Sequence, residues 1–266
     1  MRVGVLGATG RMGRATCQAV LEAAGLELVA AVARATGVGR PLRQLVPGAP
    51  EGMVVDGGLE ALVGAGAEVV VDFSRPEATA AAAEGLLPEG VHLVSGTTGL
   101  AAAVMEDLGN LAGKADNGNV VWAPNFALGA VLAMHFAAVA GRFYPAAEVI
   151  ELHHQGKADA PSGTALRTAR AIAASREQTP ATGGGSESVA GVRGGEVDGV
   201  RVHSVRLPGL VAHQEVIFGG QGEVLTVRHD SLDRSSFMPG VLLAVRAVAD
   251  RPGLTVGLEP LLGLAT

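Results

Sequence analysis

Short apolar runs alternate with helix-like segments along the first 125 residues. Runs rich in β-branched residues occupy 3–6, 27–33, 53–55, 69–73, 92–95 and 120–122, and segments with helical periodicity occupy 12–24, 76–87 and 100–112. Continuous apolar strands that alternate with helices are typical of a parallel sheet covered by helices on both faces. Ser74 and Pro76 are suited to begin the second helix, as its cap and in its first turn. The pattern predicts a doubly wound α/β domain.

The pattern changes after residue 125. Helical periodicity covers 128–143, 163–175 and 235–249, and strand-like runs cover 147–152, 200–207, 211–218 and 223–229. Gly-containing turns separate the last three strand-like runs, which predicts an antiparallel meander. Residues 180–199 are rich in Gly and Ser, so we expect a mobile loop there. This part should form a smaller α+β domain with a largely antiparallel sheet.

Composition narrows the class of protein. The 266 residues are 48% hydrophobic and 17% charged, which suits one large or two modest folded domains. A net charge of −6 without a basic run argues against nucleic acid as a partner. No apolar run reaches the roughly 18 residues of a membrane span, and no secretory signal precedes the first strand. The single cysteine, Cys17, fits a reducing compartment, so we expect a cytoplasmic protein.

A glycine-rich turn follows the first strand. The segment GATGRMG at residues 7–13 lies between that strand and a helix. In such a unit, glycines let a pyrophosphate approach the backbone and the helix N-terminus. The spacing is GxxGxxG rather than GxGxxG, and a purely structural turn is the alternative. Its position in the chain favours a dinucleotide site and a Rossmann-type domain.

The end of the second strand bears on the choice of cofactor. In the usual NAD-type domain an acidic residue at this position binds the ribose hydroxyls, but the chain has Ala33 followed by Arg34. The guanidinium of Arg34 could pair with a 2′-phosphate, and Arg11 could add a second cation. We therefore expect a preference for NADPH, with NADH still possible. The alternative is that Arg34 is a solvated loop residue.

Two later strand ends also suit a cofactor crevice. The segments SGTTG at 95–99 and APNF at 123–126 each follow a predicted strand. Ligands of open parallel sheets bind outside the carboxyl ends of the strands, and small residues there leave room for a nicotinamide ring. Each segment is also an ordinary turn sequence.

The candidate chemistry concentrates in residues 151–165, with the sequence ELHHQGKADAPSGTA. Only Lys114 and Lys157 are lysines among 20 Lys and Arg residues, and lysine is a compact charge whose pKa can shift. His153 and His154 end a strand, so their side chains should point to opposite faces. A lone histidine is more often structural, but two beside Lys157 are suited to proton transfer.

A capped helix follows this cluster. Ser162 is a suitable N-cap, and the first-turn amides of Gly163 and Thr164 could bind a carboxylate at the positive end of the helix dipole. An ordinary capped helix is the alternative. We expect no metal site, because there is no cysteine pair and adjacent histidines cannot easily share one ion.

These segments resemble a known family. The motif at 151–165 resembles the defining motif of the dihydrodipicolinate reductases, also called 4-hydroxy-tetrahydrodipicolinate reductases. The segments GATGRMG at 7–13, DFSRPE at 72–77, GTTG at 96–99 and NF at 125–126 resemble further blocks of that family in the same order. The resemblance spans most of the chain.

The resemblance implies a fold and a reaction. Residues 1–126 and 235–266 would form the dinucleotide-binding domain, and residues 127–234 a substrate-binding domain that also builds a homotetramer. The reaction would reduce a cyclic dicarboxylate to tetrahydrodipicolinate in lysine and diaminopimelate biosynthesis. Whether the true substrate is the hydroxylated or the dehydrated form stays open.

The resemblance also implies roles for single residues. His153 would be proton donor and acceptor and Lys157 proton donor, and which of them protonates the substrate stays open. The residues that match substrate-binding positions are His154, Lys157, Gly163 and Thr164. Those that match cofactor-binding positions are Gly7, Ala8, Thr9, Gly10, Arg11, Met12, Arg34, Gly96, Thr97, Thr98, Ala123, Pro124, Asn125 and Phe126. Many relatives carry an acidic residue at the position of Ala33, and its absence here reinforces the expectation of NADPH.

Two other functions are compatible with the glycine-rich turn. One is another two-domain NAD(P)H reductase or dehydrogenase of the amino-acid type, and the other is a non-catalytic NAD(P)H sensor. Neither accounts for His153, His154 and Lys157 ahead of a capped helix. A reductase of the resembling family accounts for both features.

Overall fold

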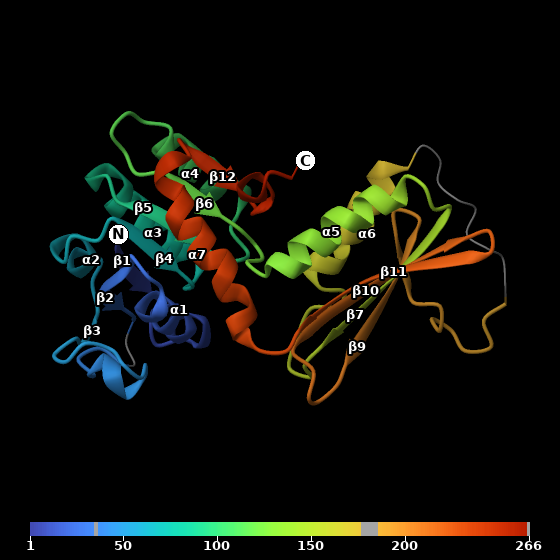
Figure 1. Ribbon diagram of the computed structural model, residues 1–266, viewed down its shortest axis with the longest axis horizontal. Coiled ribbons are helices and arrows are strands. Elements are labelled where there is room, and N and C mark those ends of the chain that lie inside the picture. Colours follow the sequence, from blue (N-terminus) through green and yellow to red (C-terminus); the bar gives the residue numbers. More distant parts are fainter. Residues whose placement is uncertain (35–36, 177–185, 265–266) are drawn as a thin grey trace. The chain divides into compact units, whose positions relative to one another are not determined.

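The chain divides into two compact units (Figure 1). The structure, a computed structural model, describes residues 1–34, 37–176 and 186–264. Unit 1 comprises Met1–Phe126 and Phe237–Thr266, and unit 2 comprises Ala127–Ser236. The last helix of the chain therefore returns to unit 1, where it packs against the first helix. The assignment of a cofactor to unit 1 and of a substrate to unit 2 remains a prediction.

Unit 1 contains a seven-stranded sheet in the order β12-β6-β5-β4-β1-β2-β3, and all of its strand pairings are parallel. The strands are β1 (Arg2–Leu6), β2 (Glu27–Val32), β3 (Val55–Asp56), β4 (Val69–Asp72), β5 (His92–Ser95), β6 (Val120–Trp122) and β12 (Leu254–Val256). The helices are α1 (Arg11–Glu22), α2 (Glu60–Gly64), α3 (Pro76–Leu86), α4 (Ala102–Ala112) and α7 (Met238–Ala247).

Helices cover both faces of this sheet. The apolar side chains of α2, α3 and α4 form one continuous core with strand residues such as Val32, Val70 and Leu93. The helices α1 and α7 pack against each other and against the sheet. This arrangement confirms the predicted Rossmann-type doubly wound sheet.

The order of the strands locates a crevice. The chain runs outward in opposite directions from the neighbouring strands β1 and β4. At such a switch point the turns that follow the two strands diverge, and ligands bind between them. The β1–α1 turn and the β4–α3 turn therefore border the expected ligand site.

Some local predictions for unit 1 were wrong. Ser74 does not cap α3, because Arg75 occupies the N-cap position and the side chain of Ser74 bonds to Asp72 instead. The helix α2 and the strand β12 were not predicted, since five and three residues are too short for a periodic signal.

Unit 2 is a five-stranded sheet in the order β11-β10-β7-β9-β8, packed against two helices. Its elements are α5 (Leu128–Gly141), β7 (Ala146–His153), α6 (Gly163–Ser175), β8 (Gly195–Val197), β9 (Val200–Arg206), β10 (Ala212–Gly220) and β11 (Glu223–Ser231). Alternate residues of the strands, among them Val149, Val202 and Val216, form a core with α5 and α6. This confirms an α+β domain with a largely antiparallel sheet.

The predicted three-strand meander was wrong. The strand β7 lies between β9 and β10, and β9 runs parallel to β7. The connection from β7 to β9 contains helix α6 and the short strand β8, and a crossover that contains a helix allows two strands of one sheet to run parallel. Only β10 and β11 form the expected hairpin.

The predicted mobile loop at 180–199 lies partly outside the described residues, which resume at 186. Its last part is not a loop, because Gly195–Val197 forms β8 and pairs with β9.

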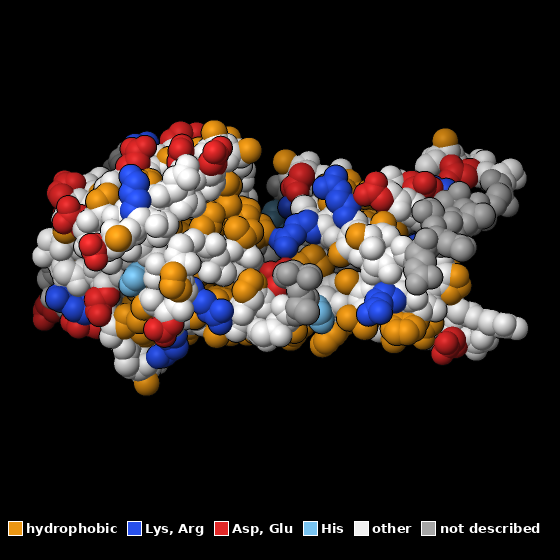
Figure 2. All heavy atoms as spheres, turned by 90° about the horizontal axis from the view of Figure 1, so that it is seen from above, with side chains coloured by type: hydrophobic (Ala, Val, Ile, Leu, Met, Phe, Trp, Pro, Cys, Tyr) orange, Lys and Arg blue, Asp and Glu red, His pale blue; other side chains and the backbone are white. Residues whose placement is uncertain are grey.

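None of the helices in the described parts of the chain is long and apolar enough to cross a membrane. On unit 1, in the left part of Figure 2, acidic and basic side chains lie side by side on the visible surface.

In the glycine-rich turn between β1 and α1, the backbone at the start of α1 lies very close to the backbone at the end of β1. Gly7 has a φ of +84°, which favours glycine, and its carbonyl accepts a hydrogen bond from the N–H of Gly10 at 2.9 Å. A Cβ atom at Gly13 would lie 2.1 Å from the same carbonyl oxygen. The first turn of α1 can therefore approach the end of β1 only because position 13 has no side chain.

Replacing Gly13 with alanine should destabilise unit 1, because the new methyl group would have to displace backbone atoms. We expect the free energy of unfolding to fall by about 1–3 kcal/mol, measured by urea unfolding. Gly85→Ala is the matched control, since its Cβ would lie at an ordinary 3.7 Å from Leu59 and alanine favours a helix. An unchanged free energy of unfolding in Gly13→Ala would contradict the close approach.

Candidate active site

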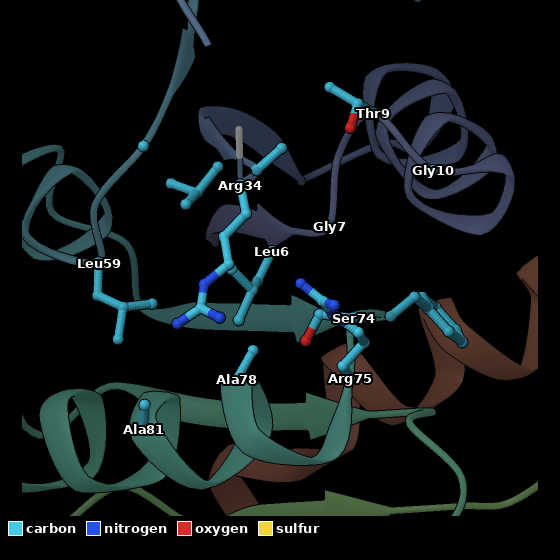
Figure 3. A pocket seen from close by; sticks show the side chains of 14 residues that line it. Leu6, Gly7, Thr9, Gly10, Arg34, Leu59, Ser74, Arg75, Ala78 and Ala81 are labelled. Carbon is cyan, nitrogen blue, oxygen red and sulfur yellow. The ribbon is translucent and has the colours of Figure 1, made fainter. Parts of the chain in front are cut away.

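Unit 1 contains a cavity of about 300 Å³ at the carboxyl ends of β1, β2 and β4 (Figure 3). It is lined by Leu6, Gly7, Thr9, Gly10, Val32, Ala33, Arg34, Gly57, Leu59, Phe73, Ser74, Arg75, Ala78 and Ala81. Figure 3 shows the side chains of Arg34 and Arg75 extending into it, Arg34 from the end of β2 and Arg75 from the start of α3. The glycine-rich turn forms a further wall.

The cavity combines backbone amides with positive charge. Among the residues that the structure describes, neither Arg34 nor Arg75 forms an ion pair with a carboxylate. Two guanidinium groups beside the start of α1 are suited to bind phosphate groups, since N–H donors and the helix dipole act in the same sense. The residues of unit 1 therefore fit the phosphates and the ribose of a dinucleotide.

The predicted cofactor residues fall into two groups. Gly7, Thr9, Gly10 and Arg34 line the cavity. The others do not line it: Ala8, Arg11 and Met12 belong to the turn and the start of α1, and Gly96, Thr97, Thr98, Ala123, Pro124, Asn125 and Phe126 follow β5 and β6. Because all of these strands are parallel, the second group lies at the same edge of the sheet as the cavity.

A buried carboxylate organises the loops at this edge. Asp72 ends β4 with no exposed surface and accepts hydrogen bonds from four hydroxyl groups. Their donors are Ser74, Thr79 at 2.5 Å, Ser95 at 2.9 Å and Thr97 at 3.0 Å. Hydroxyl donors satisfy a buried charge, so the Thr97 side chain is committed to structure.

Aromatic contacts fix the ends of β5 and β6. Phe126 is buried, and its ring centroid lies 5.7 Å from that of Phe73 in an edge-to-face pair. The indole N–H of Trp122 donates to the carbonyl oxygen of Thr97 at 2.8 Å. The side chain of Phe126 thus belongs to the core of unit 1, so at this position only the backbone can face a cofactor.

In unit 2 a second buried carboxylate lies beside the predicted proton donor. Glu151 and His153 point to the same face of β7, and His153 Nδ1 bonds to the Glu151 carboxylate. Arg206 on β9 donates to both oxygens, at 2.7 Å to Oε1 and 2.9 Å to Oε2. The backbone N–H of Ser162 lies 3.3 Å from Oε1.

These donors decide the charge of Glu151. Burial alone raises the pKa of a carboxyl group, but hydrogen bonds from His153, Arg206 and Ser204 outweigh it and hold the pKa of Glu151 at about 2. Glu151 is therefore ionised under all ordinary conditions. An ionised carboxylate can only accept hydrogen bonds. The Nδ1 atom of His153 therefore carries a hydrogen, and this N–H group donates a hydrogen bond to Glu151.

Lys157 follows in a turn, in which its N–H donates to the carbonyl of His154 at 3.1 Å. Its Nζ lies 2.7 Å from Asp159 Oδ1. This hydrogen bond lowers the pKa of Asp159 against the opposing effect of burial. His153 and Lys157 therefore each have a carboxylate partner of their own, and His154 lies half-buried between them in the sequence.

The helix α6 begins as the sequence predicted. Ser162 is its N-cap, and the Ser162 hydroxyl accepts a hydrogen bond from the N–H of Ala165 at 3.2 Å. Gly163 is exposed and Thr164 half-buried in the first turn. All of the predicted catalytic and substrate residues thus lie between β7 and the first turn of α6. The described residues contain no group of side chains that could hold a metal ion.

The residues of these sites that were missed from the sequence include Arg206, Asp72, Arg75 and Glu151, of which Glu151 was noted only within the motif at 151–165. Arg206 is 55 residues from Glu151 along the chain, and only the parallel pairing of β9 with β7 brings them together. Asp72 and Arg75 were noted only within the motif DFSRPE. A signal existed for Asp72, since a carboxylate that ends an apolar strand must be bonded if it is buried.

Comparison with known proteins identifies the family. The family model described as "Dihydrodipicolinate reductase, N-terminus" matches residues 1–126, and the one described as "Dihydrodipicolinate reductase, C-terminus" matches residues 129–262. The chain belongs to the dihydrodipicolinate reductase family. The predicted family and the predicted class, an NAD(P)H-dependent oxidoreductase of lysine and diaminopimelate biosynthesis, are therefore confirmed.

Individual relatives agree with this assignment. A 4-hydroxy-tetrahydrodipicolinate reductase of Mycobacterium marinum (strain ATCC BAA-535 / M) is 51% identical over 265 residues, which cover 99% of this chain and 100% of the relative. The solved structure of a dipicolinate-bound dihydrodipicolinate reductase from Paenisporosarcina sp. TG-14 is 37% identical, with a TM-score of 0.84 and coverage of 98% of both chains.

A more distant structure shares only the fold. An amine dehydrogenase from Mycobacterium smegmatis is 14% identical, with a TM-score of 0.66 and coverage of 96% of this chain and 94% of the neighbour. A dehydrogenase of the amino-acid type was the main alternative function from the sequence. The family match decides against it.

The depressed pKa of Glu151 gives an expectation for stability. A carboxylate with a folded-state pKa of about 2 and an ordinary value of 4.5 stabilises the folded state above pH 4.5 and loses that effect as the pH falls toward 2. We expect Glu151→Gln, which resembles the protonated form, to lower the free energy of unfolding at neutral pH. The difference from wild type should shrink steadily on acidification through this range, measured by urea unfolding. A difference independent of pH would contradict the assigned charge.

Proposed function

We propose that this protein reduces 4-hydroxy-tetrahydrodipicolinate, or its dehydrated form dihydrodipicolinate, to tetrahydrodipicolinate with NADPH. The observation that carries the proposal is the juxtaposition in unit 2 of His153, Lys157 and the first turn of α6. A cyclic substrate with two carboxylates needs cationic and amide donors for binding and an acid for chemistry. The similar solved structure, described as bound to dipicolinate, fits this class of ligand.

The residues of unit 2 divide the work. Lys157, His154 and the amides of Gly163 and Thr164 hold the carboxylates. NADPH, when bound, would supply a hydride to the conjugated C=C–C=N system of the dehydrated form, which the hydroxylated form reaches by losing one water. The enamine-like anion that results takes a proton from His153 or from Lys157.

The preference for NADPH rests on the cavity of unit 1. Arg34 extends into it and Arg75 faces the same space (Figure 3), and Ala33 stands where an NAD-type domain carries an acid. We assign the adenosine 2′-phosphate to Arg34. NADH then binds without this charge-assisted contact and is the poorer cofactor.

The open face of the unit 2 sheet supports assembly into a homotetramer. Its helices cover one face, and the residues that alternate with the core positions, such as Ile150 and Ile217, keep part of their surface exposed. Such a face is suited to pack against another copy of the chain. We place the reaction in the cytoplasm, in keeping with a single buried thiol at Cys17.

The activity itself is tested by the oxidation of NADPH with freshly generated substrate, followed at 340 nm. We expect saturable oxidation that depends on the substrate. Oxidation that needs an amino acid or a simple keto acid instead would show another dehydrogenase, and binding of NADPH without turnover of any of these compounds would show a sensor.

Replacing Arg34 with alanine should separate the two cofactors. We expect KM for NADPH to rise about 10-fold or more, the equivalent of a hydrogen bond to a charged group, while KM for NADH changes little. The matched control is Arg43→Ala, whose side chain is 58% exposed and pairs with Glu51 on the surface of unit 1. Equal effects on NADPH and NADH would remove Arg34 from the 2′-phosphate site.

Variants of His153 and Lys157 test the division of work. We expect His153→Ala to lower kcat by about 100-fold or more with a smaller effect on KM, and Lys157→Ala to raise KM for the substrate as well as lower kcat. Steady-state kinetics at saturating NADPH measures both. An unchanged kcat in His153→Ala would exclude that residue as the proton donor.

A further inference from the structure

The buried ion pair of Glu151 and Arg206 is not explained by stability. Two charges taken out of water lose hydration that their attraction barely repays, and apolar residues of similar volume would stabilise a core at least as well. Glu151 is fully buried, and the side chain of Arg206 is 18% exposed. The core cluster of unit 2 consists of apolar side chains, among them Val149, Ile172 and Phe218.

The geometry of the pair leaves Glu151 little freedom. Arg206 donates one N–H to each carboxylate oxygen, and two parallel hydrogen bonds fix the plane of a carboxylate. Arg206 itself is held by the carbonyl oxygens of Val205 at 2.8 Å and Asp159 at 2.7 Å. The N–H of Ser162 adds a further donor to Oε1.

Among the residues proposed to take part in the reaction, His153 is the one whose side chain contacts the Glu151 carboxylate. In the described residues this contact is made through Nδ1. A proton on Nδ1 that points to a fixed acceptor sets both the tautomer and the plane of an imidazole ring. The other ring nitrogen, Nε2, is then the atom that can give up a proton and take it back. The His153 side chain is 14% exposed, so the ring is mostly enclosed and still reaches solvent.

We propose that Glu151 and Arg206 are positioning residues for the reduction: Arg206 fixes the carboxylate of Glu151, and Glu151 holds His153 with Nδ1–H inward and Nε2 toward the substrate. The proposal rests on the proposed function and specifies how its acid is oriented. It also selects His153 over Lys157 as the proton donor, because His153 bonds directly to Glu151, whereas the ammonium group of Lys157 pairs with the half-exposed Asp159.

The hydrogen bonds of Glu151 and Arg206 also reach the segment that is proposed to bind the substrate carboxylates. The same Glu151 oxygen that binds Arg206 accepts the N–H of Ser162, the N-cap of α6. The Nη2 group of Arg206 also donates a hydrogen bond to the backbone carbonyl of Asp159, which is two residues after Lys157. One buried carboxylate therefore fixes the proton donor relative to the groups that bind the substrate.

The test compares Glu151→Gln with wild type. Glutamine keeps the shape of the side chain but removes the charge and can present an N–H to His153. We expect kcat to fall by about 100-fold or more, with KM for the substrate and Kd for NADPH within about threefold. In ¹⁵N-histidine NMR spectra, the signal of the protonated, hydrogen-bonded Nδ1 of His153 should be present in wild type and lost in Glu151→Gln.

The matched control is Glu148→Gln. Glu148 is also on β7 and also ion-paired, with Arg193 and His203, but three residues away it points to the other face of the sheet. It should keep the wild-type kcat and the His153 signal. Wild-type kcat in a folded Glu151→Gln variant would overturn the proposal.

A second substitution tests the proposal in case Glu151→Gln does not fold. Arg206→Lys keeps the positive charge but cannot donate to both oxygens at once, so we expect an intermediate loss of kcat at nearly constant KM. If neither variant folds, the pair serves stability and the positioning role is refuted. If wild type itself does not reduce the substrate, the proposed function fails, whereas the NMR signal of His153 still tests the positioning role by itself.

Discussion

The arrangement of unit 2 depends on one charge that cannot leave the protein interior. Once β7 places Glu151 in the core, its carboxylate requires donors from every side, and the chain supplies them from β7, β9 and the start of α6. Segments distant in the sequence are thereby fixed around one point. His153 and the cap of the helix that follows acquire their positions from this requirement, because an unbonded buried carboxylate would cost several kcal/mol.

Unit 1 also contains a buried carboxylate that is satisfied by hydrogen bonds, but its donors are different. Asp72 is buried at the end of β4, and four hydroxyl groups from the loops around it satisfy the carboxylate. Hydroxyls neutralise no charge, whereas the donors of Glu151 include a guanidinium and an imidazole. The difference suits the two tasks, since a cofactor site needs rigid loops and a proton donor needs an ionised partner.

The sequence allowed the periodic and local features to be predicted, but not the contacts between distant segments. Apolar strands that alternate with helices, and capped helices such as α6, leave a strong local pattern. The residues of the motif at 151–165 are also close together along the chain. The parallel pairing of β9 with β7 has no local signature, so the meander was predicted wrongly and Arg206 was missed. Ser74 was assigned to α3 because cap residues and loop residues share the same chemistry.

A double-mutant cycle between Glu151 and His153 tests most directly whether one residue acts through the other. The measurement is kcat at saturating NADPH and substrate for wild type, Glu151→Gln, His153→Ala and the double variant. If Glu151 acts by orienting His153, the double variant should have the same kcat as His153→Ala alone. Losses that multiply in the double variant would show independent roles and contradict the account.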